Sequence, residues 1–202
     1  MNRIAKIVVA AFASAGLIAS AAACGGGQSA STEGAGTINV VASVNQWGTL
    51  AEELGGKNVE VTSIVHTTSV DPHDYEPTSA DISKLQKAQV IVVNGADYDA
   101  WAVKAAKNTK ATVVNAAEVG GVKEGGNPHI WFSASVRKSA AEAITKAYEK
   151  ADASKKADFD KLNKQWQNDE GKVESKIAEV RKKAKGLNYA ATESVAYYLA
   201  ED

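Results

Sequence analysis

The chain has 202 residues, enough for one domain or two small ones, and its apolar fraction of 45% and charged fraction of 23% are ordinary for a globular protein. Lysine and arginine total 23 against 24 acidic residues, and no basic block is interleaved with aromatic side chains. This balance does not favour a nucleic-acid-binding protein. A single cysteine excludes an intramolecular disulfide.

Residues 1–24 have the pattern of a lipoprotein signal peptide. Arg3 and Lys6 form a positive start, and a stretch of small and apolar residues follows. Small residues precede Cys24, which resembles the lipobox of bacterial lipoproteins, although Ala21 stands where leucine is usual. We expect Cys24 to be lipidated and to anchor the protein to the outside of the cell membrane. The alternative is ordinary secretion with cleavage after an Ala-x-Ala site, which also gives an extracytoplasmic protein.

Residues 25–36 are rich in glycine, serine and alanine and are predicted to form a flexible tether. Beyond it, short β-rich runs alternate with helical patterns. Strands are predicted at 37–43, 59–65, 89–93 and 111–115, and helices at 46–54, from the capping box at 78–81, and at 98–107. This order predicts an α/β fold in which residues 37–132 form an N-terminal lobe around a parallel sheet with helices on both faces.

Residues 133–185 carry a helical stripe of apolar positions with a break or kink at 152–154. A straight helix of that length would span roughly 70 Å, so the segment must bend, split or bridge between lobes. The heptad is too irregular for a coiled coil, and we interpret the segment as a linking helix. Residues 186–202 then predict a strand at 187–192 and a helix at 194–200, the beginning of a second α/β lobe that we expect to be truncated.

Two of the three histidines follow a proline in a short loop. His73 lies between Pro72 and Pro77, and His129 follows Pro128. Proline restricts the backbone on both sides of itself, and a neutral imidazole is a common metal ligand. Taken alone, His73 is better explained as an exposed surface histidine and His129 as a half-buried side chain. As a pair at element boundaries, they indicate two halves of one metal site.

Two further residues are weaker candidates. His66 at the end of the second predicted strand is expected to lie at the surface or behind the ligands. Glu193 lies at the end of the last predicted strand, where it could supply an oxygen ligand. It could equally be an acidic residue that favours the start of a helix through the helix dipole.

Three segments together resemble the metal-binding lipoproteins of zinc and manganese ABC importers, also called the lipoprotein receptor antigen I or adhesin-type family. They read D-P-H-D-Y-E-P-T at 71–78, V-V-N-G-A at 92–96 and N-P-H-I-W at 127–131. The resemblance covers the chain from residue 37 to its end. It implies that His73 and His129 are the two metal ligands of the first lobe.

The resemblance also implies a third ligand. The family has T-S-E/H-G-x-x-x-Y-F at the start of a helix in the second lobe, and Glu193 aligns with its metal-binding position. Here Thr192 directly precedes the acid and Ser194 follows it, so the family's serine and glycine are both missing. The fourth family ligand, an acidic residue far into the second lobe, has no counterpart in this sequence.

The implied function is an extracytoplasmic substrate-binding protein rather than an enzyme. It would act as a monomer, capture Mn²⁺ or Zn²⁺ between two lobes and deliver the ion to an ABC permease in the membrane. A glutamate at the third position and a loop at 116–126 without histidine favour manganese, although zinc binds nitrogen and oxygen ligands more tightly.

Two other functions remain as alternatives. One is a surface adhesin with the same fold. The other is a metallohydrolase, which would need an open coordination position and a general base. Asp74 and Glu76 are the only acidic candidates beside His73 that could act as the base, and no H-E-x-x-H motif occurs.

Overall fold

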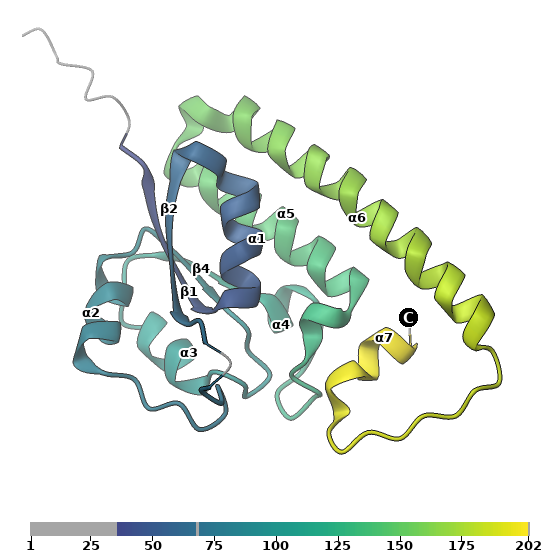
Figure 1. The fold of residues 1–202 in the computed structure, drawn as a ribbon. Helices are drawn as coiled ribbons and strands as arrows, with labels where there is room; N and C mark the ends of the chain where they lie inside the picture. Colours follow the sequence, from purple (N-terminus) through teal and green to yellow (C-terminus); the bar gives the residue numbers. More distant parts are fainter. Residues whose placement is uncertain (1–35, 68, 202) are drawn as a thin grey trace, which may run out of the picture. The chain divides into compact units, whose positions relative to one another are not determined.

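A computed structural model of the chain describes residues 36–67 and 69–201 (Figure 1). The predicted signal peptide, the lipidation site at Cys24 and nearly all of the tether lie outside the described residues. Within the described part, no helix is both long enough and apolar enough to cross a membrane.

Four strands form the predicted parallel sheet. They are β1 (Ile38–Val44), β2 (Val59–Val65), β3 (Val90–Val93) and β4 (Thr112–Asn115), in the order β2-β1-β3-β4. Val40 of β1 pairs with Val61 on one side and with Val90 on the other. Every residue of β3 is buried, which is typical of a central parallel strand with both faces covered.

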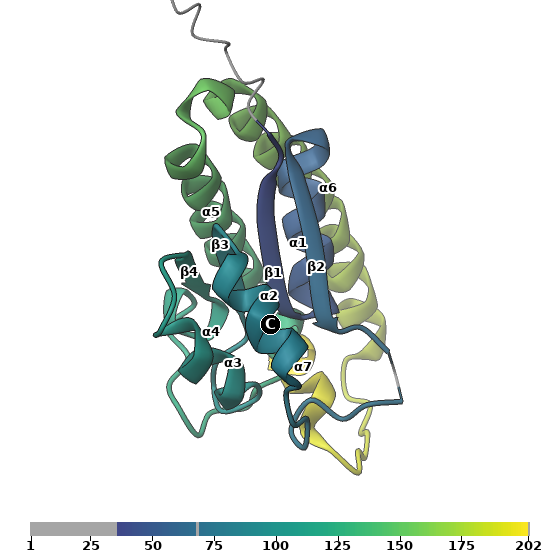
Figure 2. The same cartoon turned by 90° about the vertical axis from the view of Figure 1, so that its left-hand side faces the viewer.

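Helices cover both faces of the sheet, as predicted. α1 (Asn45–Gly55) and α5 (Ala134–Ala151) pack together on one face, and α2 (Ser79–Lys87) and α3 (Ala100–Ala106) pack together on the other (Figure 2). The short helix α4 (Ala116–Val119) follows β4 and also contacts α5. The largest side chains that are almost completely buried in this core are Trp47, Tyr148, Phe159, Leu54, Leu85, Ile91, Ile130 and Ile144.

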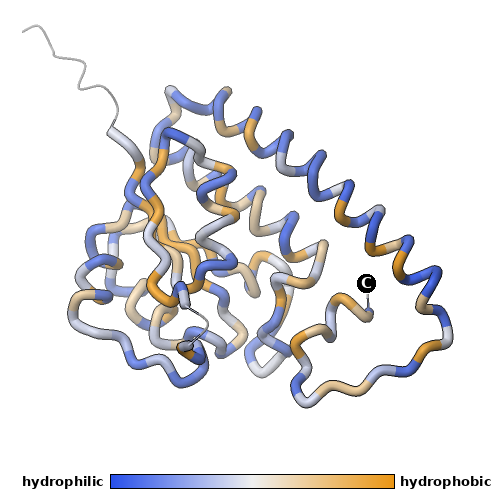
Figure 3. The backbone as a smooth tube through the Cα atoms, viewed as in Figure 1, coloured by the Kyte–Doolittle hydropathy of each residue, from blue (hydrophilic) through white to orange (hydrophobic). Residues whose placement is uncertain are grey.

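The helical segment predicted at 133–185 is two helices rather than one. α5 ends at Ala151, the 3-10 turn η3 (Ala153–Lys155) follows, and α6 (Lys156–Ala184) runs back along α5 and α1. The Asp152 side chain accepts a hydrogen bond from the Ser154 backbone N–H at 3.0 Å, which stabilises the turn. The break therefore lies where the sequence predicted it, and Figure 3 shows α6 as a mostly hydrophilic helix with spaced hydrophobic positions.

The strand predicted at 187–192 is wrong. These residues are irregular, and they lead into the 3-10 turn η4 (Ser194–Ala196) and the short helix α7 (Tyr197–Glu201). A strand requires a neighbour for its backbone hydrogen bonds, and the described part of the chain places no second strand beside this segment. Leu187 and Tyr189 are 74% and 68% exposed, so the segment contributes little to the core.

Arg137 of α5 joins α6 to the loop that carries His129. Its guanidinium donates to Oε1 of Glu170 on α6, with an Nε–Oε1 distance of 2.9 Å, and also to Oε1 of Glu174. A further hydrogen bond, 3.0 Å long, goes to the carbonyl oxygen of Trp131 in the 3-10 turn η2 (Ile130–Phe132). The Glu170 side chain is only 6% exposed, so its charge depends on Arg137.

We predict that Glu170→Ala lowers the free energy of unfolding by about 2 kcal/mol, because it leaves a mostly buried guanidinium with Glu174, which is partially exposed, as its only carboxylate partner among the described residues. The matched control is Glu174→Ala. The Glu174 side chain is 33% exposed, so this substitution is expected to lower the free energy of unfolding by less than about 1 kcal/mol. Urea unfolding of both variants provides the comparison. Equal costs for the two substitutions would contradict this account of the Arg137 cluster.

Candidate metal centre

The His73 loop connects β2 to α2 and is held by its own polar side chains. Asp71 accepts a hydrogen bond from the backbone N–H of His73 at 2.9 Å, and its carbonyl accepts one from the backbone N–H of Asp74 at 3.2 Å. Asp71 therefore closes a tight turn, with His73 at its centre. The loop leaves the carboxyl end of a parallel strand, where ligand sites of such sheets lie.

Tyr75 anchors the other end of this loop to α2. Its hydroxyl donates to Oδ2 of Asp81 at 2.7 Å, and the side chains of Thr78 and Asp81 form the predicted capping box at the start of α2. Burial alone would raise the pKa of the Asp81 carboxyl, but hydrogen bonds from Thr78 and Tyr75 outweigh it and hold that pKa well below its usual range. Burial and the Asp81 contact raise the pKa of Tyr75 to about 12.

The turn after β3 has an unusual backbone. Gly95, Ala96 and Asp97 all have positive φ angles, of 78°, 50° and 62°. Such a conformation costs free energy at the two residues that are not glycine. Asp99 offsets that cost, because its carboxylate accepts hydrogen bonds from the backbone N–H groups of Asn94 at 2.7 Å and Gly95 at 2.8 Å. The turn brings Tyr98 towards the two histidine loops.

Asn94 ties the carboxyl end of β3 to the His129 loop. This residue is fully buried, and its Oδ1 accepts a hydrogen bond from Nε1 of Trp47 at 2.8 Å. Its Nδ2 donates to the carbonyl of Pro128 at 3.0 Å, directly before His129. The sheet and the histidine loop are thus joined by one satisfied amide.

Asn127 fixes the ring of His129. Its Oδ1 accepts from the backbone N–H of His129 at 3.0 Å and lies 2.8 Å from Nδ1 of the same residue. A backbone N–H can only donate, so the atom facing it must be the amide oxygen. Nδ1 faces that same oxygen and therefore carries the proton. In the neutral ring, Nε2 is left with a free lone pair, which is the form that binds a metal.

The structure brings His73, His129 and Glu193 together. One ligand atom from each lies within 4.8 Å of the others, and this is the one such group of histidine, cysteine and acidic side chains found among the described residues. Nε2 of His129 is 3.2 Å from Oε1 of Glu193. Glu193 directly precedes η4, and the C-terminal segment packs through α7 against η2, the turn after His129 (Figure 1). Three residues far apart in the sequence therefore supply the cluster.

The electrostatics of the cluster favour a cation. Burial lowers the pKa of His129, and the attraction of Glu193, which acts in the opposite direction, does not restore it. The ring is therefore mainly neutral at pH 7, and its Nε2 lone pair faces a carboxylate oxygen. Two acceptors at 3.2 Å repel each other unless a proton or a metal ion lies between them.

Aromatic rings form the inner wall of the cluster. The Tyr98 ring lies 4.6 Å from the His73 ring and 6.0 Å from the His129 ring, and Trp131 lies 5.3 Å from His129, as distances between ring centroids. Burial, with smaller contributions from Asp71 and Glu193, raises the pKa of Tyr98 to about 12. Tyr98 thus stays neutral at physiological pH and adds no negative charge beside the three ligand atoms.

All three members of this cluster are candidates that the sequence analysis named. His66 lies outside the cluster and is exposed, and its Nδ1 is 3.1 Å from the carbonyl oxygen of Ile64. Sequence reasoning missed Asn127, Tyr98 and Arg137. The signal for Asn127 was available, because an asparagine two residues before a histidine can hydrogen-bond its backbone. Tyr98 and Arg137 gave no comparable local signal.

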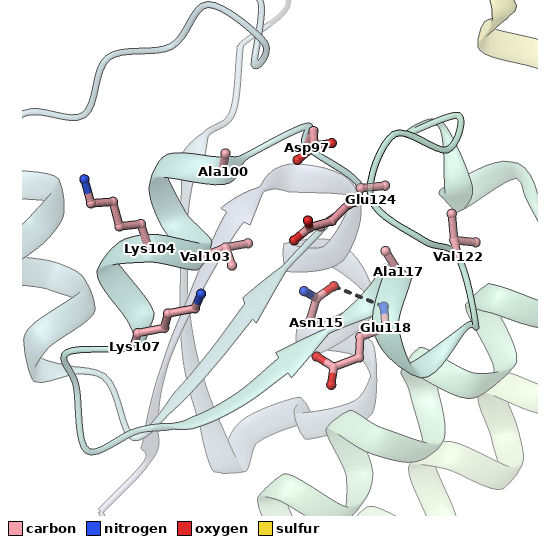
Figure 4. Close-up of a pocket in the computed structure, with 12 residues that line it drawn as sticks. Asp97, Ala100, Val103, Lys104, Lys107, Asn115, Ala117, Glu118, Val122 and Glu124 are labelled. Carbon is pink, nitrogen blue, oxygen red and sulfur yellow. Dashed lines mark hydrogen bonds between the residues drawn. The ribbon is translucent and has the colours of Figure 1, made fainter.

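A separate pocket of about 350 Å³ lies between α3, the turn after β3 and α4 (Figure 4). It shares no lining residue with the histidine cluster. Lys104 and Lys107 line one side, and Glu118 and Glu124 come from the α4 helix and the loop after it. Charges of both signs lie around its rim, and no set of converging metal ligands is found there among the described residues. The candidate metal centre is therefore the histidine cluster.

Asp81→Asn tests how the His73 loop is anchored. At pH 7 we predict a loss of about 1–2 kcal/mol in the free energy of unfolding, because the charged acceptor of the capping box and of Tyr75 is lost. The pKa of Asp81 is lower in the folded protein than its unfolded value of about 3.9. The ionised Asp81 carboxylate therefore stabilises the folded protein above about pH 4, and this stabilisation is lost as the pH falls further.

Urea unfolding of the wild type and Asp81→Asn at pH 7 and pH 3 measures this difference. The difference between the two proteins in free energy of unfolding should be smaller at pH 3 than at pH 7. The control is Glu60→Gln, since Glu60 is exposed on β2 and should have little effect at either pH. A gap that stays constant with pH would show that Asp81 does not act through its charge.

Comparison with known proteins finds relatives among the substrate-binding proteins of metal transporters. The metal ABC transporter substrate-binding lipoprotein ScbA of Streptococcus cristatus is 28% identical over 156 residues, covering 69% of this chain and 50% of that protein. The high-affinity zinc uptake system protein ZnuA of Bacillus subtilis is 26% identical, covering 67% and 49%. The chain thus spans about half the length of these curated relatives.

Two solved structures of metal-binding proteins resemble this chain in fold. The metal-dependent lipoprotein YcdH of Bacillus subtilis is 25% identical with a TM-score of 0.75, covering 82% of this chain and 64% of that one. Zn(II)-bound AdcA of Streptococcus pneumoniae, at 21% identity and a TM-score of 0.72, shares the fold over 82% of this chain and 37% of its own. The model of one protein family, described as zinc-uptake complex component A, periplasmic, matches residues 40–202. The chain therefore belongs to the ZnuA family.

Proposed function

We propose that this chain captures a divalent transition metal ion, Zn²⁺ or Mn²⁺, through Nε2 of His129, a ring nitrogen of His73 and a carboxylate oxygen of Glu193. The observation that carries the proposal is the convergence of these three ligand atoms within 4.8 Å. The metal is the cargo of the protein and not a resident cofactor. Two imidazole nitrogens with a carboxylate oxygen are a ligand set that suits both ions.

The position of the cluster supports capture and release. His129 is buried, whereas His73 and Glu193 are exposed. One ligand is thus fixed by the core, and the other two lie on segments at the surface that an ion can reach from solvent. The exposed pair belongs to a loop after β2 and to the C-terminal segment, so the ion would join two parts of the chain that are otherwise distant in sequence.

The choice between zinc and manganese depends on more than ligand type. Relatives include both a zinc uptake protein and the manganese-binding lipoprotein MntA of Halalkalibacterium halodurans, which is 29% identical over 120 residues and covers 55% of this chain and 39% of that protein. With identical ligands, zinc binds more tightly than manganese. We therefore expect this chain to bind Zn²⁺ more tightly in vitro, whichever ion it carries in the cell.

The partner in this proposal is the permease of an ABC importer, and the location is the outer side of the cell membrane. The family supports the partner, and the relatives named as lipoproteins support a membrane anchor. Cys24 is the residue we assign to lipidation, and we expect a monomer. The site is assigned to binding and not to turnover, because Asp74 and Glu76, the two acids considered as a general base, are exposed and lie outside the cluster.

The metal proposal is tested with three single substitutions. His129→Ala and His73→Ala should each weaken Zn²⁺ binding by at least about a hundredfold. Even the loss of a residue that only hydrogen-bonds a metal ligand typically lowers metal affinity by about 10- to 100-fold. His66→Ala is the matched control and should bind as the wild type does, because His66 is an exposed histidine outside the cluster. Competition against a chromophoric chelator gives the affinities, and elemental analysis gives the stoichiometry.

One ion per chain, lost in the two cluster variants and retained in His66→Ala, is the expected outcome. Equal binding by all four proteins would contradict the assignment of His73 and His129. A wild type that takes up neither Zn²⁺ nor Mn²⁺ would contradict the proposed function itself.

A further inference from the structure

Asn127 contacts both sides of the candidate metal centre. On one side, its Oδ1 holds the backbone N–H and the ring of His129. On the other, its Nδ2 donates a 2.8 Å hydrogen bond to the carbonyl oxygen of Ser194, the residue directly after Glu193. One side-chain amide therefore bridges two of the proposed ligands, although 66 positions separate Asn127 from Glu193.

The orientation of this amide is determined by its partners. The oxygen faces an N–H group of His129, and the nitrogen faces a carbonyl of Ser194. Exchanging the two atoms would place a donor against a donor and an acceptor against an acceptor. The same amide therefore determines which nitrogen of His129 is protonated and where the Glu193 segment lies.

The backbone of Asn127 makes a second link to that segment. Its carbonyl oxygen accepts a 2.9 Å hydrogen bond from the hydroxyl of Tyr198 on α7, and Tyr198 is half-buried. α7 also packs against η2, the turn that begins directly after His129. Two hydrogen bonds to one residue, one before α7 and one from it, hold the C-terminal segment against the His129 loop.

We propose that Asn127 is a positioning residue that couples the orientation of the His129 imidazole to the placement of Glu193. This inference rests on the proposed function, in which both residues hold the metal. Because Asn127 touches the ring on one side and the carbonyl next to Glu193 on the other, a disturbance of either ligand reaches the other through it. The segment that carries Glu193 is largely exposed and has few other contacts to define its position.

The first test is a double-mutant cycle with Zn²⁺ as the probe. Asn127→Ala should weaken Zn²⁺ binding by about 10- to 100-fold in the wild-type background, as expected for a residue that orients metal ligands. In a Glu193→Ala background the same substitution should cost several-fold less, because only its effect on His129 remains. An equal factor in both backgrounds, or unchanged binding by Asn127→Ala, would overturn the coupling.

The second test separates the link to α7 from the contact with the ring. Tyr198→Phe removes only the hydroxyl that donates to the Asn127 carbonyl, and it should weaken Zn²⁺ binding several-fold. Tyr197→Phe is its matched control and should bind as the wild type does, because the exposed Tyr197 hydroxyl makes no hydrogen bond to another described residue. Equal binding by both variants would contradict a positioning role for this contact, and it would do so even if Asn127→Ala failed to fold.

A metal-independent readout separates this inference from the proposed function. Nitrogen-15 NMR of the metal-free protein reports which ring nitrogen of His129 carries the proton. The wild type should show the form protonated at Nδ1, and Asn127→Ala should shift the ring towards a mixture of the two forms. Unchanged ring signals in Asn127→Ala would overturn the inference, whereas absence of Zn²⁺ binding by the wild type would overturn the proposed function.

Discussion

A neutral imidazole nitrogen and a carboxylate oxygen lie 3.2 Å apart at the centre of this protein's candidate site. Both atoms are acceptors, and they attract each other only through a shared cation or proton. Burial lowers the pKa of His129 and so reduces the chance that a proton serves this purpose near neutral pH. The contact with Asn127 keeps the free lone pair on Nε2, the atom that faces Glu193. We propose a metal ion as the partner that both atoms bind.

The fold places these atoms near the point where the strand order of the sheet reverses. With the strand order β2-β1-β3-β4, the connections from β1 and from β3 lead to opposite sides, and ligands in such folds bind at the carboxyl ends beside that point. The buried Asn94 lies there and joins Trp47 of α1 to the Pro128 carbonyl. The backbone before His129 is thus fixed to the core, and Asn127 orients the His129 ring. The His73 loop depends instead on short polar turns and on Asp81.

Much of the fold could be predicted from local sequence. The apolar run of β3, the capping box at Thr78 and the break near Asp152 are each determined by neighbouring residues, and all three are confirmed. The strand predicted at 187–192 is wrong because a strand also depends on a distant partner, which a local pattern does not reveal. The limits of the lobes and of the tether stay predictions.

The candidate site divides in the same way. His73 and His129 stood out through the prolines beside them, whereas Glu193 was assigned by resemblance to a family pattern from which its neighbours depart. The residues that hold the segments around this site in place were not predicted. Asn127 reaches Ser194, and Arg137 reaches Glu170, across long stretches of sequence. Such contacts follow from the packing of α5, α6 and α7 and not from any local motif.

X-ray absorption spectroscopy of the Zn²⁺-loaded protein tests the central claim most directly, because it reports the atoms bound to the ion. We predict two imidazole nitrogens at about 2.0–2.1 Å and at least one carboxylate oxygen at about 2.0–2.2 Å. The Glu193→Ala protein should keep both imidazoles and lose the carboxylate contribution. A first coordination shell without imidazole nitrogen would contradict the account.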